Sequence, residues 1–223
     1  MYQYCLFDLD GTLTDPREGI TKCVQYALHH YGIEEPDLTK LEPFIGPPLT
    51  DSFMQFYGFP EKKAWEACAV YRERFIPIGA YENKVFEGVP EMLQRMKEKG
   101  IQIAIASSKP EVSVRKILEH FDLMQYFDVV VGSAPDGSHG RKEEIVERAL
   151  SELGVQVLSD EDRYSQCAMV GDRKFDICGA KTQGVTAVGV SFGFADEGEL
   201  EQAGADYIVD SIELLSDEAK EGE

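Results

Sequence analysis

The sequence predicts an α/β protein in which a parallel sheet is interrupted near its start by an inserted unit of helices. Two observations predict this fold. Short apolar runs alternate with amphipathic stretches over most of the 223 residues, a pattern typical of parallel strands joined by helices. One segment, from about residue 15 to residue 84, shows helical periodicity and no apolar run of strand type. The length suits a core domain of ordinary size with a smaller insertion.

Five apolar runs are the expected strands of the sheet. They cover residues 4–9, 101–107, 127–132, 167–171 and 186–191. Two of the stretches between them carry an apolar stripe at helical spacing, and a glycine follows each stripe where a helix would end. The sequence therefore predicts a Rossmann-like core made of residues 1–14 and 85–223, with helices on both faces of a parallel sheet.

The inserted segment, residues 15–84, is expected to form a helical cap domain. Apolar side chains recur at helical spacing in residues 20–31, and residues 61–75 form a second amphipathic stretch. The sequence IGPPL, residues 45–49, places Gly46 in a tight and stiff turn. Two interpretations of this turn stay open: a loop that binds the substrate through Gly46, or a plain connection between two helices.

The composition limits the ligands and the location of the protein. Asp and Glu number 41 against 22 Lys and Arg, which gives a formal net charge of −19 and argues against a nucleic acid polymer or an anionic membrane as partner. A small anionic substrate stays compatible, because a bound cation can reverse the field inside a pocket. The five cysteines are scattered, and no apolar run approaches ~18 residues. We expect a cytoplasmic protein without a signal peptide or a membrane segment.

Polar side chains follow four successive predicted strands. In parallel α/β sheets, ligands bind beyond the carboxyl ends of the strands, so four polar elements at this edge predict one functional site. In chain order the elements are Asp8 and Asp10, then Ser107, Ser108 and Lys109, then Lys142, and finally Asp172 and Asp176.

The acidic residues of this set predict a Mg²⁺ site. Asp8 and Asp172 supply the hard oxygen ligands that Mg²⁺ uses in proteins. Asp176 lies one helical turn beyond Asp172 and would face the same point if a helix starts there. The backbone carbonyl of Asp10 is a further expected ligand. The bound ion would offset the repulsion between the carboxylates and let an anionic phosphate approach.

The other polar residues suit the binding of a phosphate. The hydroxyl of Ser107 can donate to a phosphoryl oxygen, and Lys142 supplies a positive charge for the same oxygens or for the nucleophile. Ser108 and Lys109 are further candidates for substrate binding. Arg141 could take the place of Lys142, or the two could be a solvated basic pair at the start of a helix.

Two carboxylates after one strand predict a division of roles in phosphoryl transfer. A free aspartate can attack phosphorus and form an aspartyl phosphate, and a second carboxyl can protonate the leaving alcohol and later deprotonate water. Asp8, beside the metal and Lys142, is the expected nucleophile. Asp10 is the expected proton carrier, because the environments of the two groups must separate their pKa values.

These motifs together resemble those of the haloacid dehalogenase superfamily of aspartyl-phosphate phosphatases, over nearly the whole chain. The segments FDLDGTLTD and MVGDRKFD, with Ser107 and Lys142, carry the resemblance. It implies Asp8 as nucleophile, Asp10 as acid and base, and Mg²⁺ on Asp8, the Asp10 carbonyl and Asp172, with Asp176 beside the metal.

The inserted helices are similar to those of the branch that resembles phosphoglycolate phosphatases. The segments IGPPL, YENKVFEGV and ASSKP resemble a bacterial subgroup of this branch, described as phosphoglycolate phosphatases or 5'-nucleotidases. Two positions depart from the expected pattern. Ser107 replaces the commoner Thr and keeps the hydroxyl, whereas Phe175 stands where the subgroup has His and cannot donate a hydrogen bond.

The sequence therefore predicts a Mg²⁺-dependent phosphatase that hydrolyses a small phosphorylated metabolite through an aspartyl-phosphate intermediate. A phosphosugar mutase or phosphotransferase uses the same catalytic set and is the first alternative. A non-catalytic binding protein is the second, and the intact set of Asp8, Asp10, Lys142 and Asp172 argues against it. The sequence gives neither the physiological substrate nor the oligomeric state.

Overall fold

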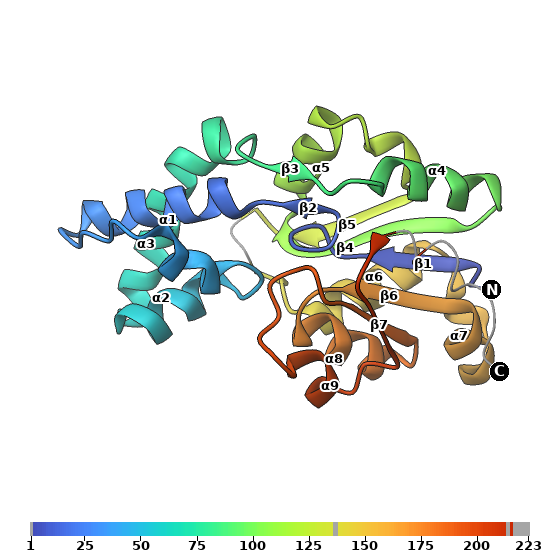
Figure 1. The fold of residues 1–223 in the computed structure, drawn as a ribbon. Helices are drawn as coiled ribbons and strands as arrows, with labels where there is room; N and C mark the ends of the chain where they lie inside the picture. The colour runs from blue at the N-terminus through green and yellow to red at the C-terminus, as the bar shows by residue number, and fades with distance from the viewer. Residues whose placement is uncertain (1, 136–137, 213–214, 216–223) are drawn as a thin grey trace. The chain divides into compact units, whose positions relative to one another are not determined.

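The structure is a computed structural model that describes residues 2–135, 138–212 and 215 (Figure 1). The chain divides into two compact units. The α/β unit comprises Met1–Thr14 and Val85–Glu223, and the helical unit comprises Asp15–Lys84. The assignment of the helical unit as a cap over an active site stays a prediction.

The α/β unit is built on a six-stranded parallel sheet. The order of its strands is β5-β4-β1-β6-β7-β8, and neighbouring strands pair in parallel, which confirms the predicted fold class. The strands are β1 (Tyr4–Phe7), β4 (Gln102–Pro110), β5 (Val129–Ser133), β6 (Cys167–Gly171), β7 (Thr186–Val190) and β8 (Tyr207–Val209).

Strand β1 lies between β4 and β6, at the point where the strand order reverses. Phe7, its last residue, pairs with Ile105 of β4 and Val170 of β6. The register therefore brings the chain after β1 level with the chain after β6. A crevice outside the carboxyl ends of strands at such a switch point is the usual ligand site of this architecture.

Helices cover both faces of this sheet, with α4 and α5 on one side and α6 and α8 on the other (Figure 1). Ile145 and Val146 of α6 and Ile177 of α8 pack with Leu6 and Met169 of the strands in one buried apolar cluster. The helices are α4 (Val89–Glu98), α5 (Glu111–His120), α6 (Lys142–Glu152), α7 (Asp160–Gln166), α8 (Lys174–Gln183) and α9 (Glu199–Ala203), with short 3-10 helices at Met124–Tyr126 and Val155–Val157.

The helical unit has an apolar core of its own. Phe44 and Phe53 are buried, with ring centroids 5.0 Å apart, and Phe59 stacks on Phe53. The elements are α1 (Arg17–His30), a 3-10 helix (Leu38–Phe44), α2 (Leu49–Tyr57), α3 (Glu61–Arg74) and a π-helix (Phe75–Gly79). The two-residue strands β2 (Thr14–Asp15) and β3 (Lys84–Val85) form a two-stranded sheet where the chain passes from one unit to the other.

The structure differs from the expected elements at several places. Strand β1 ends at Phe7, two residues before the end of its expected run, and β5 begins at Val129, two residues after the start of its run. Strand β4 continues to Pro110 through a register irregularity that begins after Ala106, so the segment expected to follow the strand belongs to it. Strand β8 and helix α7 were not expected, because β8 has only three residues and α7 buries no residue. None of the helices in the described part of the chain is long and apolar enough to cross a membrane.

Candidate active site

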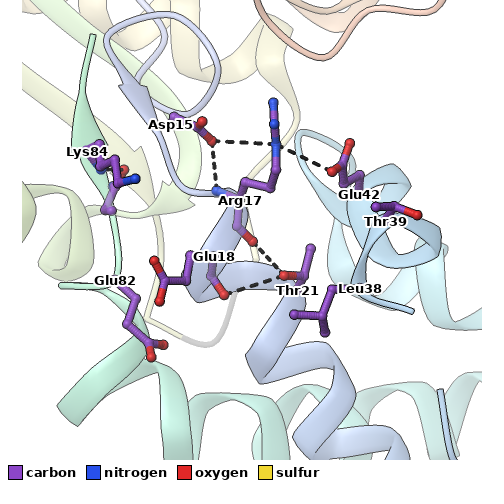
Figure 2. Close-up of a pocket in the computed structure, with 10 residues that line it drawn as sticks. Asp15, Arg17, Glu18, Thr21, Leu38, Thr39, Glu42, Glu82 and Lys84 are labelled. Atoms are coloured by element: carbon purple, nitrogen blue, oxygen red, sulfur yellow. Dashed lines mark hydrogen bonds and ion pairs between the residues drawn. The ribbon is translucent and has the colours of Figure 1, made fainter. Parts of the chain in front are cut away.

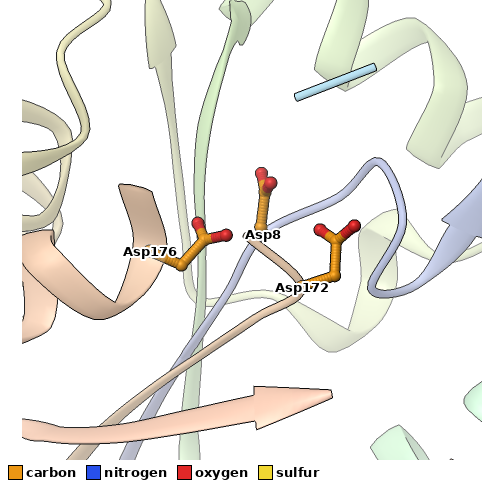
Figure 3. Close-up of side chains that lie close together, drawn as sticks. All are labelled: Asp8, Asp172 and Asp176. Atoms are coloured by element: carbon orange, nitrogen blue, oxygen red, sulfur yellow. The ribbon is translucent and has the colours of Figure 1, made fainter. Parts of the chain in front are cut away.

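Three aspartates from distant parts of the sequence meet at the carboxyl edge of the sheet. Carboxylate oxygens of Asp8, Asp172 and Asp176 lie within 4.8 Å of one another, and all three side chains are buried (Figure 3). Asp8 follows β1, Asp172 follows β6, and Asp176 lies in the first turn of α8. The structure thus brings together the three carboxylates that the sequence predicts as metal ligands.

The loop after β1 is shaped by a tight turn and by one glycine. The carbonyl of Leu9 accepts hydrogen bonds from the N–H groups of Leu13 and Thr14, both at 3.0 Å, which folds the chain back on itself. Gly11 has a φ of +83°, and a Cβ at this position would meet the carboxylate of Asp172. The turn therefore requires glycine for its backbone conformation and for the close approach to the site.

Both oxygens of Asp172 have hydrogen-bond donors. Thr12 donates from its hydroxyl to Oδ1 at 3.4 Å, and the N–H of Phe194 donates to Oδ2 at 2.8 Å. Burial, together with the nearby charges of Asp176 and Asp8, raises the pKa of Asp172 well above its usual range. A nearby cation would favour the ionised carboxylate.

Asp176 closes the start of α8. Its Oδ2 accepts a hydrogen bond from the N–H of Arg173 at 3.0 Å, as part of a capping box. Burial raises the pKa of Asp176, although Lys142 acts in the opposite direction. The helix start thus turns Asp176 toward the same point as Asp172, as its spacing in the sequence predicts.

Lys142, and not Arg141, lies among these carboxylates. Its Nζ is 3.1 Å from Oδ1 of Asp8 and 2.8 Å from Oδ1 of Asp176, and it donates to the carbonyl of Ala106 at 2.9 Å. Burial by itself lowers the pKa of Lys142, but Asp176 and Asp8 hold it above its usual range. The side chain of Arg141 is 77% exposed and pairs with Glu144. The geometry therefore favours Lys142 over the alternative that the sequence left open.

Asp10 is paired with a lysine, and nothing in the sequence indicated this contact. Nζ of Lys109 lies 2.6 Å from Oδ2 of Asp10, and both side chains are about nine-tenths buried. Burial raises the pKa of Asp10, against the lowering effect of Lys109. Lys109, a predicted substrate-binding residue, is therefore in direct contact with the predicted proton carrier.

The remaining predicted substrate-binding residues lie in different surroundings. Ser107 is 2% exposed, and its Oγ accepts a hydrogen bond from the N–H of Lys109 at 3.4 Å. Ser108 is partly exposed. Gly46 belongs to the helical unit and has a φ of +101°. Substrate binding by Ser108 and Gly46 stays a prediction.

The charges of the site do not balance. With all four carboxylates ionised (Asp8, Asp10, Asp172 and Asp176) against two lysines (Lys109 and Lys142), four minus two leaves a formal excess of two negative charges. Among the described residues, Oδ1 of Asp10 is buried without a hydrogen bond, and Oδ1 of Asp8 and of Asp176 have the ion pairs with Lys142 as their polar contacts. Buried charges without full compensation are costly. The residues present therefore fit a divalent cation in charge, in ligand type and in free lone pairs.

The helical unit contains a pocket of about 330 Å³ (Figure 2). Nε of Arg17 lies 3.4 Å from Oε1 of Glu42 at its wall. Gly46 is not among the lining residues, which are Asp15, Arg17, Glu18, Thr21, Leu38, Thr39, Glu42, Glu82, Asn83 and Lys84. With four carboxylates and two basic side chains, this wall favours a polar or cationic group over an anionic one.

The sequence of residues 5–190 matches the family of haloacid dehalogenase-like hydrolases. This segment is most of the chain, and the protein therefore belongs to this family. The superfamily predicted from the motifs is confirmed.

Individual relatives give a finer comparison. A 5'-nucleotidase of Pseudomonas aeruginosa is 49% identical over 199 residues, which cover 89% of this chain and 87% of that protein. The tyrosine-protein kinase PtkA of Mycobacterium tuberculosis is 35% identical over 192 residues, 86% of this chain and 63% of the kinase. The crystal structure of a predicted phosphatase from Clostridium acetobutylicum superposes with a TM-score of 0.91 at 43% identity, over 98% of both chains. Together with the family, the 5'-nucleotidase and the predicted phosphatase confirm the prediction of a phosphatase-type hydrolase.

Proposed function

We propose that the protein is a Mg²⁺-dependent phosphatase that hydrolyses a small phosphomonoester through an aspartyl phosphate on Asp8. One observation carries this proposal. Asp8 lies in a buried cluster of carboxylates whose two excess negative charges match a divalent cation, and Lys142 lies 3.1 Å from its Oδ1. A nucleophile, a positive charge and a candidate metal site at one point are the parts that phosphoryl transfer needs.

Asp8, Asp172 and the backbone carbonyl of Asp10 would hold the metal, with Asp176 beside it. When bound, Mg²⁺ supplies positive charge that neutralises phosphoryl oxygens and offsets the repulsion between carboxylates. The raised pKa values of Asp172 and Asp176 support this assignment, because their main causes are burial and neighbouring negative charge. A cation would remove the second cause.

The reaction has two halves. In the first, a carboxylate oxygen of Asp8 attacks phosphorus, the bond to the ester oxygen breaks, and protonated Asp10 gives its proton to the leaving oxygen. In the second, Asp10 takes a proton from water, the water oxygen attacks phosphorus, and the bond to Asp8 breaks. Inorganic phosphate leaves, and both aspartates return to their starting state.

The environment of Asp10 supports its role as proton carrier. Burial raises its pKa, so the protonated form is more accessible near neutral pH than for an aspartate in water. Lys109, at 2.6 Å, stabilises the ionised form that must accept a proton from water. Burial thus favours the protonated form of Asp10, and Lys109 favours the ionised form. A group that both gives and takes a proton needs both forms to be accessible.

The phosphate is proposed to bind to Ser107, Ser108, Lys109 and Lys142. Ser107 and Lys142 are buried near the end of β4, which supports a direct contact with phosphoryl oxygens. The helical unit is proposed to act as a cap that excludes bulk water from the phosphoenzyme, with Gly46 in a loop that binds the substrate. Its insertion directly after the loop that carries Asp8 and Asp10 supports this role.

We propose a nucleoside 5'-monophosphate as the first substrate class to test and phosphoglycolate as the second. A relative 49% identical to this chain is named a 5'-nucleotidase, which supports the order. We also propose a cytoplasmic location, because the five cysteines are free thiols and four of them are buried.

The test is an assay of the purified protein with Mg²⁺, para-nitrophenyl phosphate and a panel of phosphorylated metabolites. We expect release of inorganic phosphate that stops on addition of EDTA and returns with Mg²⁺. The variant Asp8→Asn should lose at least ~10³-fold in turnover, because the attacking carboxylate is gone. Near-normal hydrolysis by this variant would rule out Asp8 as the nucleophile.

Phosphoryl transfer to an acceptor other than water is a second candidate function. It is favoured by the relation to a protein named as a tyrosine-protein kinase, 35% identical over 192 residues. Both reactions would use the same phosphoenzyme, so the product decides between them. Stoichiometric inorganic phosphate supports hydrolysis, whereas a phosphorylated acceptor with little free phosphate supports transfer.

A further inference from the structure

We infer that Glu199 is a positioning residue for the metal site, because it ties together the two segments that orient Asp172 and Asp176. The inference rests on the metal site of the proposed function and concerns a residue outside the predicted motifs. Glu199 begins helix α9, 23 residues beyond Asp176 in the sequence, and is 9% exposed.

The carboxylate of Glu199 accepts four hydrogen bonds from two directions. From the start of α8, Arg173 donates through Nε at 2.9 Å and Nη2 at 3.2 Å, and the N–H of Lys174 donates at 2.8 Å. From the loop before α9, the N–H of Asp196 donates at 3.2 Å. One side chain therefore joins the first turn of α8 to the loop that follows β7.

Both segments make direct contact with the acidic cluster. At the N-cap of α8, the N–H of Arg173 donates to Oδ2 of Asp176 at 3.0 Å. In the loop, the N–H of Phe194 donates to Oδ2 of Asp172 at 2.8 Å. A Cβ at Gly193 would meet the side chain of Asp172, so this loop runs directly against it. A shift of either segment would change the direction of a proposed metal ligand.

Another carboxylate at the far end of α8 provides a matched comparison. Asp206 also joins a basic side chain of α8 to a backbone N–H, since it pairs with Lys181 and accepts from Ala187 at 2.8 Å. Within the described part of the chain, neither Lys181 nor Ala187 forms a hydrogen bond or an ion pair with Asp8, Asp172 or Asp176. Both pairs join a basic side chain to a carboxylate that also accepts a backbone N–H. The Lys181–Asp206 pair is more exposed, and only the Arg173–Glu199 pair lies beside the acidic cluster.

The test compares two double variants that each keep the net charge. Arg173→Met/Glu199→Met removes the pair at the site, and Lys181→Met/Asp206→Met removes the pair at the far end of α8. Replacing both partners avoids an uncompensated buried charge, and it leaves the electrostatic attraction for Mg²⁺ nearly unchanged. The dissociation constant for Mg²⁺ is measured by calorimetry on the metal-free proteins, and the melting temperature is measured in parallel.

We expect the first double variant to bind Mg²⁺ at least ~10-fold more weakly than the wild type, the size of effect known for residues that orient metal ligands. The second should bind within about twofold of the wild type. An equal melting temperature with an unchanged Mg²⁺ affinity in the first variant would overturn the inference. A wild-type protein that binds no Mg²⁺ would instead contradict the proposed function, and the inference with it.

A single variant keeps the test decisive if the double variant does not fold. Glu199→Asp keeps the negative charge and shortens the side chain by one methylene, so that its carboxylate can no longer join both segments in the same geometry. A Mg²⁺ affinity at least ~10-fold below that of the wild type supports positioning, and a smaller loss overturns it.

Discussion

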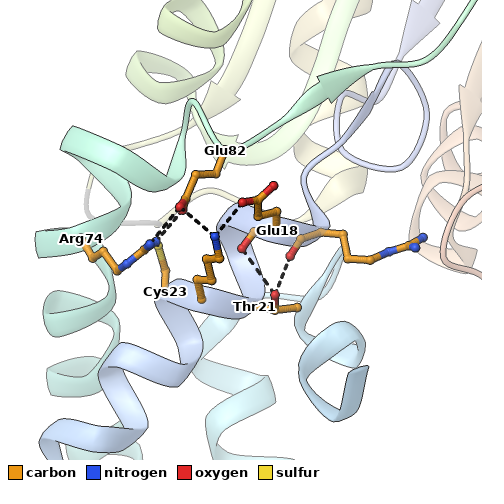
Figure 4. A network of polar contacts seen from close by, with 7 residues as sticks. Glu18, Thr21, Cys23, Arg74 and Glu82 are labelled. Carbon is orange, nitrogen blue, oxygen red and sulfur yellow. Dashed lines mark hydrogen bonds and ion pairs between the residues drawn. The ribbon is translucent and has the colours of Figure 1, made fainter. Parts of the chain in front are cut away.

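Two clusters of charged side chains, one in each unit, differ in their balance of charge. In the helical unit, Glu18 and Glu82 face Lys22 and Arg74, two negative charges against two positive ones (Figure 4). Arg74 holds Glu82 with two hydrogen bonds, at 2.7 and 3.0 Å, and also donates to Sγ of Cys23. Each charge in this network has an opposite partner.

The acidic cluster of the α/β unit lacks this balance. Its four carboxylates have two lysines as partners, and among the described residues Oδ1 of Asp10 is buried without a hydrogen bond. A balanced network stabilises the fold as it stands, whereas an unbalanced buried cluster needs a further ligand to be stable. This difference in charge balance is why we assign the network around Glu82 a structural role and the acidic cluster a role in the candidate active site.

The largest expected effect comes from making the imbalance worse. Lys142→Met leaves Asp8 and Asp176 without their buried cation, and we expect kcat/KM for para-nitrophenyl phosphate to fall by about 10²–10³-fold, as for the loss of a charge-stabilising donor. Arg141→Met is the matched control, because Arg141 is the neighbouring basic residue and is exposed. Its kcat/KM should stay within about twofold. Equal losses in both variants would contradict the assignment of Lys142.

Completing the balance should stabilise the protein. Mg²⁺ at about 100 times its dissociation constant should add ~2.7 kcal/mol to the free energy of unfolding, because it binds the folded state only. Asp172→Asn removes a proposed ligand and should abolish most of this increase, measured by urea unfolding with Mg²⁺ and with EDTA. A full increase in the Asp172→Asn variant would place the ion elsewhere.

Breaking the balanced network around Glu82 should lower the stability of the protein and leave its Mg²⁺ affinity unchanged. Glu82→Gln leaves Arg74 and Lys22 with one fewer carboxylate in a partly buried network, and we expect a loss of about 1–2 kcal/mol in the free energy of unfolding. Trp65, the one tryptophan, lies in α3 of the helical unit and reports its unfolding by fluorescence. The Mg²⁺ affinity should stay at the wild-type value. Glu34→Gln, at a residue whose side chain is 76% exposed, is the control and should leave the unfolding midpoint unchanged.

The sequence was sufficient to predict what depends on local pattern. Strand β6 coincides with the expected run at residues 167–171, since a short apolar run between turn signals has few alternatives. Asp8, Asp172 and Asp176 could be expected to meet because parallel strands end at one edge of a sheet.

The contacts that the sequence did not predict join residues far apart along the chain. Lys109 lies 99 positions after Asp10, in the stretch of β4 where the register shifts. Glu199 lies in the acidic segment DEGELE, where nothing distinguishes it from its exposed neighbours. Such pairs are fixed by tertiary packing, and only a structure shows them.

The smallest expected effect is a difference in how the two units respond to pH without metal. In the α/β unit, the pKa values of Asp10, Asp172 and Asp176 are raised, mainly by burial. A carboxyl whose pKa is raised by folding contributes its full stabilisation at pH values below 3.8, the pKa of the group in the unfolded chain. This contribution is lost as the pH rises through the pKa of the folded state. In the helical unit, Arg74 lowers the pKa of Glu82. Glu82 therefore contributes its full stabilisation at pH values above 4.5, the pKa of the group in the unfolded chain, and loses it only as the pH falls below that value.

Between pH 5 and about 7.5 in EDTA, the urea midpoint followed by circular dichroism should therefore fall, as the α/β unit loses stability. The midpoint followed by Trp65 fluorescence should stay level in this range and fall only below about pH 4.5. Added Mg²⁺ should remove the decline in the first midpoint, because the cation pairs with the ionised carboxylates, and should leave the second unchanged. Parallel declines of both midpoints in EDTA would contradict this comparison. The acidic cluster would then depend on a cation no more than the network around Glu82 does.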